Sequence, residues 1–256
     1  MNNFHFTFDK TKRSQTLKKI LLRKYKNTSP QKSKCIIVGG GDGFMLKSLK
    51  KYLKFNKPFY GINCGSFGFL MNKYQTTNLV KKVLRSKQTS INPLEMTAIN
   101  KYNSKKNLIA INEISLFRQS RQTVSIKLAS GKKTIINKLI GDGVLISSPA
   151  GSTAYNLSVH GPILSLNSGK LAVTPISPFR PRRWKGKTIS NNKLIIISNL
   201  NIKKRPMAAV ADNVEIRNVK SLKIKVNKKI KINLLHDPGM SLSKKIKLEQ
   251  AKKNIK

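Results

Sequence analysis

The chain has 256 residues, of which 52 are Lys or Arg and only 9 are Asp or Glu, so its formal net charge is +43. An apolar fraction of 39% supplies enough core for one large or two modest domains and argues against a disordered chain. No apolar run is long enough to span a bilayer and the N-terminus lacks a signal-peptide core, so we expect a cytoplasmic protein that binds no membrane.

The positive charge is spread along the whole chain instead of forming one patch. From Leu222 to Leu235 apolar residues alternate with lysines, which predicts two amphipathic strands around Asn227–Lys229 with the lysines facing water. A genome-wide base bias produces this spread, so we expect no nucleic-acid partner, although a positive field favours polyphosphate substrates. Cys35 and Cys64 show neither metal spacing nor a disulfide-rich pattern, which suits a reducing cytosol.

The N-terminal half alternates strands and helices. Phe4–Phe8 reads as a strand, and Ser14 is the expected N-cap of the helix that follows it. Cys35–Val38 is a short apolar strand that runs into the glycine turn Gly39–Gly43, and apolar residues from Phe44 onward recur at helical spacing. A strand, a glycine turn and a helix in this order predict a parallel α/β unit with a ligand at the turn.

The pattern changes in the middle of the chain. Pro58–Ile62 predicts another strand and residues 79–84 a helix, whereas short alternating strands typical of antiparallel sheets begin near Leu94. We therefore expect an α/β domain over residues 1–93 and a β-rich domain over 94–240. A helical segment over 241–256 is expected to return to the first domain.

Asp42 lies in the glycine turn, in the sequence GGGDG. An aspartate that only caps a helix contributes about 1 kcal/mol, but four flanking glycines exceed what a cap needs and indicate backbone that lies against phosphates. The turn is not a P-loop, because Leu46 and not Gly precedes Lys47. It is not a Rossmann fingerprint either, because Phe44 replaces the last glycine.

Two other acidic positions leave alternatives open. Asn112 and Glu113 interrupt a predicted strand, Leu108–Leu116, where neighbouring residues face opposite sides, so the pair either meets a ligand or forms an exposed edge. Asp142 stands in a Gly-Asp-Gly sequence that is either a plain turn or part of a site.

Gly141–Pro162 is the segment richest in small and hydroxylated residues. A short strand is followed by SSPAGST and by a helix-like run from Ala154, for which Thr153 or Ser152 is the expected N-cap. Small residues admit a ligand close to the backbone, and hydroxyls supply hydrogen bonds. We interpret this segment, with its single aromatic residue Tyr155, as a binding site for a nucleotide-like ligand.

The remaining candidates carry less signal. Arg180–Trp184 is the one local basic and aromatic cluster, and Arg182 and Arg183 there belong to a solvated loop, a phosphate channel or a subunit contact. Asp212, near Glu215, is a candidate for a second layer of residues behind a ligand.

Three motifs together resemble the NAD kinase family: GGGDGFML, the Asn112–Glu113 pair, and GDGVLISSPAGSTAYNLSVHGPI, in this order, within a similarity that runs from about residue 35 to about 240. The resemblance implies an α/β N-terminal domain, a β-rich C-terminal domain and a returning C-terminal segment. It also implies transfer of the terminal phosphate of ATP, or of polyphosphate, to the 2′-hydroxyl of the adenosine ribose of NAD. Mg²⁺ or another divalent metal and a homo-oligomeric state are implied as well; Asp42 would help to place the metal, and no residue is assigned as a dedicated metal ligand.

The same resemblance assigns roles by position. Asp42 would accept the proton, and Gly43 would approach the dinucleotide through its backbone. Phe44 and the Ser148–Ala150 triplet depart from the common pattern, which leaves the phosphate donor open. A lipid kinase with the same glycine turn, or a basic nucleic-acid-binding protein without catalysis, are the alternatives. The residues expected to bind NAD are Gly43, Asn112, Glu113, Asp142, Ala150, Thr153, Ala154, Tyr155, Asn156, Leu157 and Ser158.

Overall fold

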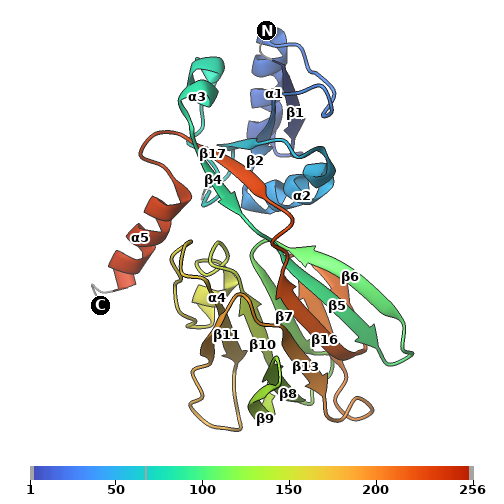
Figure 1. Ribbon diagram of the computed structural model, residues 1–256. Helices are drawn as coiled ribbons and strands as arrows, with labels where there is room; N and C mark the ends of the chain where they lie inside the picture. Colours follow the sequence, from blue (N-terminus) through green and yellow to red (C-terminus); the bar gives the residue numbers. More distant parts are fainter. Residues whose placement is uncertain (1–2, 67, 254–256) are drawn as a thin grey trace. The chain divides into compact units, whose positions relative to one another are not determined.

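The computed structural model describes residues 3–66 and 68–253, which fall into two compact units. The first unit contains the residues up to Ile91 and those from Lys231 onward, and the second unit contains Asn92–Ile230 (Figure 1). Within the described residues, no helix is both long and apolar enough to cross a membrane.

The first unit is built on a five-stranded sheet in the order β1-β2-β3-β17-β4. The strands are β1 (Phe4–Phe8), β2 (Cys35–Gly40), β3 (Phe59–Asn63), β17 (Ile232–His236) and β4 (Lys87–Ile91). The first four run parallel to their neighbours, and β4 pairs antiparallel with β17. Because all six residues of β2 are buried, this strand is covered on both faces, as its continuous apolar sequence predicts.

Helices pack on this sheet through apolar stripes. Leu17 and Leu21 of α1 (Lys12–Lys24) are fully buried in a cluster with residues of β1, β2 and β3. The expected N-cap is wrong: Thr11 caps α1, and the buried Ser14 hydroxyl instead donates to the Gly39 carbonyl at 2.7 Å. The remaining helices of this unit are α2 (Asp42–Tyr52), the 3₁₀ turn η1 (Leu53–Phe55), α3 (Leu79–Arg85) and α5 (Leu242–Lys253).

The chain returns to the first unit at Lys231, earlier than the expected boundary at residue 240. The two strands predicted around Asn227–Lys229 both form, but they belong to different units: β16 (Val219–Val226) lies in the second, whereas β17 pairs with β3 and β4 in the first. Ile232 and Leu234 of β17 are almost fully buried there, so alternation predicts the strand but not its sheet.

The second unit consists of two six-stranded antiparallel sheets and the short helix α4 (Tyr155–Ser158) (Figure 1). Residues of both sheets form one apolar cluster that includes Met96, Ile114, Leu116, Val144 and Ile146. One sheet has the order β12 (Lys187–Ser190), β11 (Lys170–Ile176), β10 (Gly143–Ser147), β7 (Glu113–Arg118), β14 (Met207–Ala211), β15 (Val214–Ile216); the other has β6 (Lys105–Ala110), β5 (Leu94–Asn100), β16, β13 (Ile195–Asn199), β8 (Val124–Ser130), β9 (Lys133–Gly141).

Candidate functional site

Asp42 is the first residue of α2, directly after the carboxyl end of β2 and its glycines. Its carboxylate accepts two backbone hydrogen bonds, from the Phe69 amide at 2.6 Å and from the Leu70 amide at 2.8 Å. Burial raises the pKa of this carboxyl above its usual value, while the two amides and the positive charge of Lys245 oppose that rise. Asp42 is therefore a partly buried carboxyl held in one orientation, which is more than a helix cap requires.

The glycines beside Asp42 divide into two pairs. A Cβ atom at Gly39 would lie 2.5 Å from the Phe8 ring, and one at Gly40 would lie 2.8 Å from the Phe44 ring, so packing within the chain explains both. A Cβ atom at Gly41 or Gly43 would meet no atom of the described residues within 4 Å. Neither has a positive φ, so neither backbone conformation nor packing among the described residues requires glycine at these two positions.

The sequence predicts Asn112 and Glu113 within one strand, but they lie at a break between two strands. β6 ends at Ala110 in one sheet and β7 begins at Glu113 in the other, so Ile111 and Asn112 connect the two sheets of the second unit. The prediction of a single strand over Leu108–Leu116 is therefore wrong. The apolar residues on both sides are buried in the core that the two sheets share, which gives the sequence a continuous apolar character.

Asp212 holds this connection in place. Its carboxylate accepts hydrogen bonds from the amides of Ile111 at 2.8 Å and Asn112 at 2.9 Å, with Glu113 more distant at 3.4 Å. The Asp212 amide in turn donates to the Glu113 carbonyl at 3.1 Å. Asp212 stands in the turn between β14 and β15 with φ +52°, a left-handed conformation that aspartate tolerates better than most residues.

The glycine and hydroxyls of the SSPAGST segment serve the fold to a larger extent than expected. A Cβ atom at Gly151 would lie 2.2 Å from the Asn112 carbonyl oxygen, so glycine is required here by the protein's own backbone. The Ser148 hydroxyl donates to the Ile111 carbonyl at 2.7 Å, and the Ser152 hydroxyl donates to the Pro149 carbonyl at 2.8 Å. The Gly151 and Ser148 contacts join the segment to Ile111 and Asn112, whereas the Ser152 hydrogen bond stays within the segment.

The short helix α4 is also fixed from inside. The expected N-cap at Thr153 or Ser152 is wrong, because Ala154 precedes the helix without any side-chain cap. The buried Asn156 amide donates to the carbonyls of Ser152 and Pro162 and accepts from the Thr174 hydroxyl. The polar atoms of Asn156 are thus used within the unit, and this residue orients its neighbours.

Among residues 150–158, the accessible side chains are those of Thr153, Tyr155 and Ser158, together with Ala154 and Leu157, whereas Ala150 is buried. The Tyr155 ring stacks on the Phe117 ring with centroids 5.9 Å apart. Burial raises the pKa of the Tyr155 hydroxyl, and the nearby charges of Glu113 and Asp142 raise it further. The structure therefore brings Glu113 of one motif close to Asp142 and Tyr155 of another.

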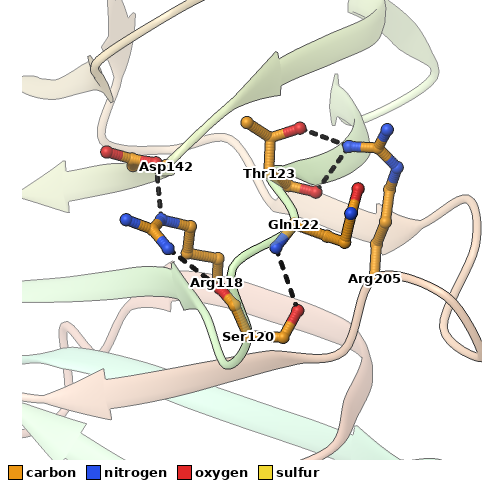
Figure 2. Close-up of polar contacts among 6 residues, drawn as sticks. All are labelled: Arg118, Ser120, Gln122, Thr123, Asp142 and Arg205. Carbon is orange, nitrogen blue, oxygen red and sulfur yellow. Dashed lines mark hydrogen bonds and ion pairs between the residues drawn. The ribbon is translucent and has the colours of Figure 1, made fainter.

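Asp142 lies where β9 passes into β10, and its carboxylate pairs with Arg118 at the end of β7 (Figure 2). The Arg118 Nε atom lies 2.6 Å from Asp142 Oδ1, and a second guanidinium nitrogen donates to the Ser120 carbonyl at 2.9 Å. Gly143 is required because a Cβ atom there would lie 1.9 Å from the Leu116 carbonyl oxygen. The Gly-Asp-Gly sequence is thus a tight strand connection whose aspartate carries an arginine partner.

The basic cluster Arg180–Trp184 follows an exposed aromatic residue, Phe179. The guanidinium groups of Arg180 and Arg182 lie 4.7 and 5.6 Å from the centre of its ring. The Arg180 backbone pairs with Ile140 of β9, and Trp184 packs against the core of the second unit. The structure places Arg183 in a left-handed turn beside them.

The described residues offer a metal ion no site made of protein side chains alone. In the part of the chain that the structure describes, no three His, Cys, Asp or Glu side chains gather closely enough to hold one. Mg²⁺ commonly binds through one or two carboxylates together with substrate phosphates. The described residues fit binding shared with substrate phosphates, in which Asp42 would be the carboxylate at the glycine turn.

Sequence reasoning missed two residues that the structure connects to these motifs. Phe117, which stacks on Tyr155, carries no polar signal and reads as one more strand residue. Lys245 in α5 contacts the loop that holds Asp42, but one lysine among so many basic residues gives no signal in the sequence.

Comparisons with known proteins agree on one family. A family model described as the ATP-NAD kinase C-terminal domain matches residues 111–215. The chain is 42% identical over 249 residues to the NAD kinase of Rhizobium meliloti, covering 97% of each protein. It is 40% identical over 237 residues to the NAD kinase of Caulobacter vibrioides, covering 93% of this chain and 91% of that one.

Two solved structures share the fold. Yeast NADH kinase complexed with NADH superimposes with a TM-score of 0.80 at 19% identity, covering 99% of this chain and 88% of that one. An NAD kinase from Archaeoglobus fulgidus in complex with ATP superimposes with a TM-score of 0.76 at 19% identity, covering 98% of each chain. The expected fold class, an α/β N-terminal part followed by a β-rich part, is confirmed.

Proposed function

The chain belongs to the NAD kinase family. From this premise we propose that it transfers a phosphoryl group from ATP to the 2′-hydroxyl of the adenosine ribose of NAD, giving NADP, and we propose which residues take part. The enzyme is a phosphotransferase with an alcohol group as acceptor. Similarity to NAD kinases over nearly the whole chain carries this assignment. It does not favour the two alternatives, a lipid kinase and a nucleic-acid-binding protein without catalysis.

Asp42 is the proposed proton acceptor. A ribose hydroxyl is a weak nucleophile at neutral pH, so a carboxylate within hydrogen-bond reach must take its proton as the new P–O bond forms. The two amide hydrogen bonds from Phe69 and Leu70 support this role, since they hold the carboxylate in one orientation before substrate arrives.

Gly41 and Gly43 are the proposed points of close approach for substrate at this turn. Neither packing nor backbone conformation among the described residues calls for glycine at either position. An absent side chain lets a substrate approach the backbone closely, as happens in glycine-rich phosphate sites. Gly43 is accordingly the backbone contact to the dinucleotide.

The adenosine half of NAD is assigned to the second unit. Asn112 and Glu113, fixed by Asp212, supply polar groups beside Tyr155, Asp142 and the accessible residues of the α4 segment. The residues proposed for this pocket are Asn112, Glu113, Asp142, Ala150, Thr153, Ala154, Tyr155, Leu157 and Ser158, with Asn156 orienting them from inside.

The phosphate donor is proposed to enter with its own divalent ion. Mg²⁺ bound to the donor phosphates neutralises their charge. Polyphosphate remains a second possible donor, because it presents the same charged groups. A reducing, cytoplasmic location is supported by two buried free thiols, Cys35 and Cys64. A homo-oligomeric state is proposed from the family resemblance alone.

The deciding experiment is incubation of the purified protein with Mg²⁺, NAD and either ATP or polyphosphate, followed by detection of NADP. We expect NADP with ATP, and the polyphosphate arm measures the donor range. Phosphorylation of diacylglycerol vesicles without NADP formation would establish the lipid-kinase alternative. No product with either acceptor, together with steeply salt-dependent RNA binding, would establish the other alternative.

A further inference from the structure

Lys245 of α5 directs its charged end into the first unit. Its Nζ atom donates to the backbone carbonyls of Gly68 at 3.1 Å, Phe69 at 2.9 Å and Met71 at 2.5 Å. An ammonium group has three hydrogens to donate, so these three carbonyls can accept all of them. Lysine side chains usually keep this group in water, and an arrangement that uses it fully inside the protein needs a reason.

The loop that accepts from Lys245 is the loop that donates to Asp42. Phe69 makes both contacts: its N–H donates to Asp42 Oδ2 and its carbonyl accepts from Lys245. The neighbouring Leu70 amide donates to the second carboxylate oxygen of Asp42. Residues 68–71 form neither helix nor strand. The side chain of Asp42 binds amides of this loop and that of Lys245 binds its carbonyls, and these contacts replace the hydrogen bonds of a regular element.

Helix α5 is anchored at the turn that carries Lys245. Leu242 and Ile246, one helical turn apart, are almost fully buried, and Ser241 caps the first turn by accepting from the Lys244 amide. Anchoring residues on both sides of Lys245 fix the direction of its side chain. The charges that act on the Lys245 ammonium are those of Asp42 and of Asp237, which follows β17 next to His236; both raise its pKa against the lowering caused by burial.

We propose that Lys245 is a positioning residue for catalysis, which fixes the 68–71 loop so that the loop amides hold the Asp42 carboxylate in its proton-accepting orientation. The inference rests on the proposed function, in which Asp42 is the proton acceptor. A purely structural role, in which Lys245 only attaches α5, is the competing explanation. The two differ in what happens at Asp42 once the lysine is removed from a folded enzyme.

Three variants separate these explanations. Lys245→Met keeps an aliphatic side chain but removes the three donors and the charge, and Lys245→Arg restores both. Lys247→Met is the matched control, since it removes an exposed lysine from the same helix. Should Lys245→Met fail to fold by circular dichroism, Lys245→Gln takes its place and is judged by the same outcomes.

The first measurement is hydrogen exchange of the Phe69 and Leu70 amides, which requires no activity. We expect exchange in Lys245→Met to be faster by about tenfold or more, because the carbonyl side of the loop loses its donors. Lys247→Met should exchange as the wild type does. Unchanged exchange in Lys245→Met would overturn the proposal, whatever the activity.

The second measurement is the split between kcat and KM for NAD. Misplacing a catalytic group by an ångström can cost on the order of 100-fold in rate, so we expect Lys245→Met to lose about tenfold or more in kcat with KM for NAD little changed. Lys245→Arg should recover most of the rate. An unchanged kcat in folded Lys245→Met would support the purely structural role.

Failure of the proposed function is distinguishable from failure of this inference. A wild type that forms no NADP refutes the function, while the exchange measurement still decides whether Lys245 controls the loop at Asp42.

Discussion

At the scale of single residues, the aspartates at the motifs differ in what holds them. Asp42 and Asp212 each accept hydrogen bonds from backbone amides in a distant part of the chain, whereas Asp142 forms an ion pair with an arginine near the surface. Backbone donors fix a carboxylate more firmly than a surface ion pair does, because an exposed pair contributes about 0–1 kcal/mol. We therefore expect substitutions at Asp42 and Asp212 to have the larger effects.

Asp42→Asn should nearly abolish turnover while leaving NAD affinity close to normal. The amide cannot accept a proton at neutral pH, and loss of a general base typically costs about 100- to 10,000-fold. The new NH₂ group also faces a backbone N–H, so the free energy of unfolding should fall by about 1–3 kcal/mol. Steady-state NADP formation, calorimetry with NAD and urea unfolding measure the three effects. Near-normal turnover would remove Asp42 from its proposed role.

Asp212→Ala should weaken both stability and NAD binding, and Asp212→Asn should weaken them less. Alanine leaves the Ile111 and Asn112 amides without their acceptor and is disfavoured at φ +52°, which together cost about 2–4 kcal/mol. Asparagine keeps one oxygen and tolerates this conformation. Urea unfolding and calorimetry with NAD test the order. Equal effects of the two substitutions would show that the carboxylate does not hold the connection.

The Asp212 contacts also show what the sequence predicts at this scale and what it does not. The motif around Asn112 is recognisable along the chain, but its acceptor lies about a hundred residues away in a turn of ordinary appearance. Likewise, a cluster of small residues predicts that another group approaches the backbone closely, but it does not specify whether that group is a ligand or the protein itself. At Gly151 the close neighbour is the backbone of Asn112.

At the scale of elements, periodicity predicts most strands and the three larger helices with their apolar faces. β1 forms where alternation places it, and α2 begins at the glycine turn. Sheet membership is a different matter, since it depends on pairing partners far along the chain. This is why the break at Ile111 and Asn112, and the separation of β16 from β17, appear only in three dimensions.

His236, the last residue of β17, should make stability pH-dependent. Burial lowers its pKa from 6.5 to about 4, with the charge of Lys245 contributing, and no described residue forms a hydrogen bond with its ring. The unfolded chain takes up this proton as pH falls below about 6.5, whereas the folded chain does so only near pH 4. The free energy of unfolding should thus decrease between these values, in total by on the order of 3 kcal/mol.

The comparison that checks this effect is His236→Leu, which keeps an apolar volume and cannot be protonated. Urea unfolding at several pH values should show the wild type losing stability relative to the variant from about pH 6.5 down to about 4, and no change in their difference from pH 7 to 8. Parallel stability curves over the whole range would contradict the prediction.

At the scale of the whole molecule, composition is informative about electrostatics and uninformative about function. A net charge of +43 implies strong self-repulsion in the compact state. Because lysine is abundant, nothing in the sequence distinguishes Lys245 from the many solvated lysines. The carboxylates are few, so each of them, including Asp42 and Glu113, is a stronger candidate for a specific role. In this chain the rare residue types therefore mark the proposed site better than the abundant ones do.

Moderate salt should stabilise the protein. The distance over which charges are screened falls from about 30 Å at 0.01 M to about 8 Å at 0.15 M salt, so repulsion among lysines weakens and the free energy of unfolding rises. Thermal unfolding across this range of NaCl should show an increasing Tm. A neutral solute at equal osmolality is the control, and a Tm that falls or stays constant with NaCl would contradict the expectation.

The position of β17 between β3 and β4 bears on the order in which the protein matures on the ribosome. Domains usually fold from the N-terminus during translation. Here the sheet begun by the first strands lacks an interior strand until Ile232–His236 has been synthesised, which happens only after the whole of Asn92–Ile230. The nascent chain thus exposes its glycine turn before the second unit is made, but completes the sheet beneath the turn only afterwards.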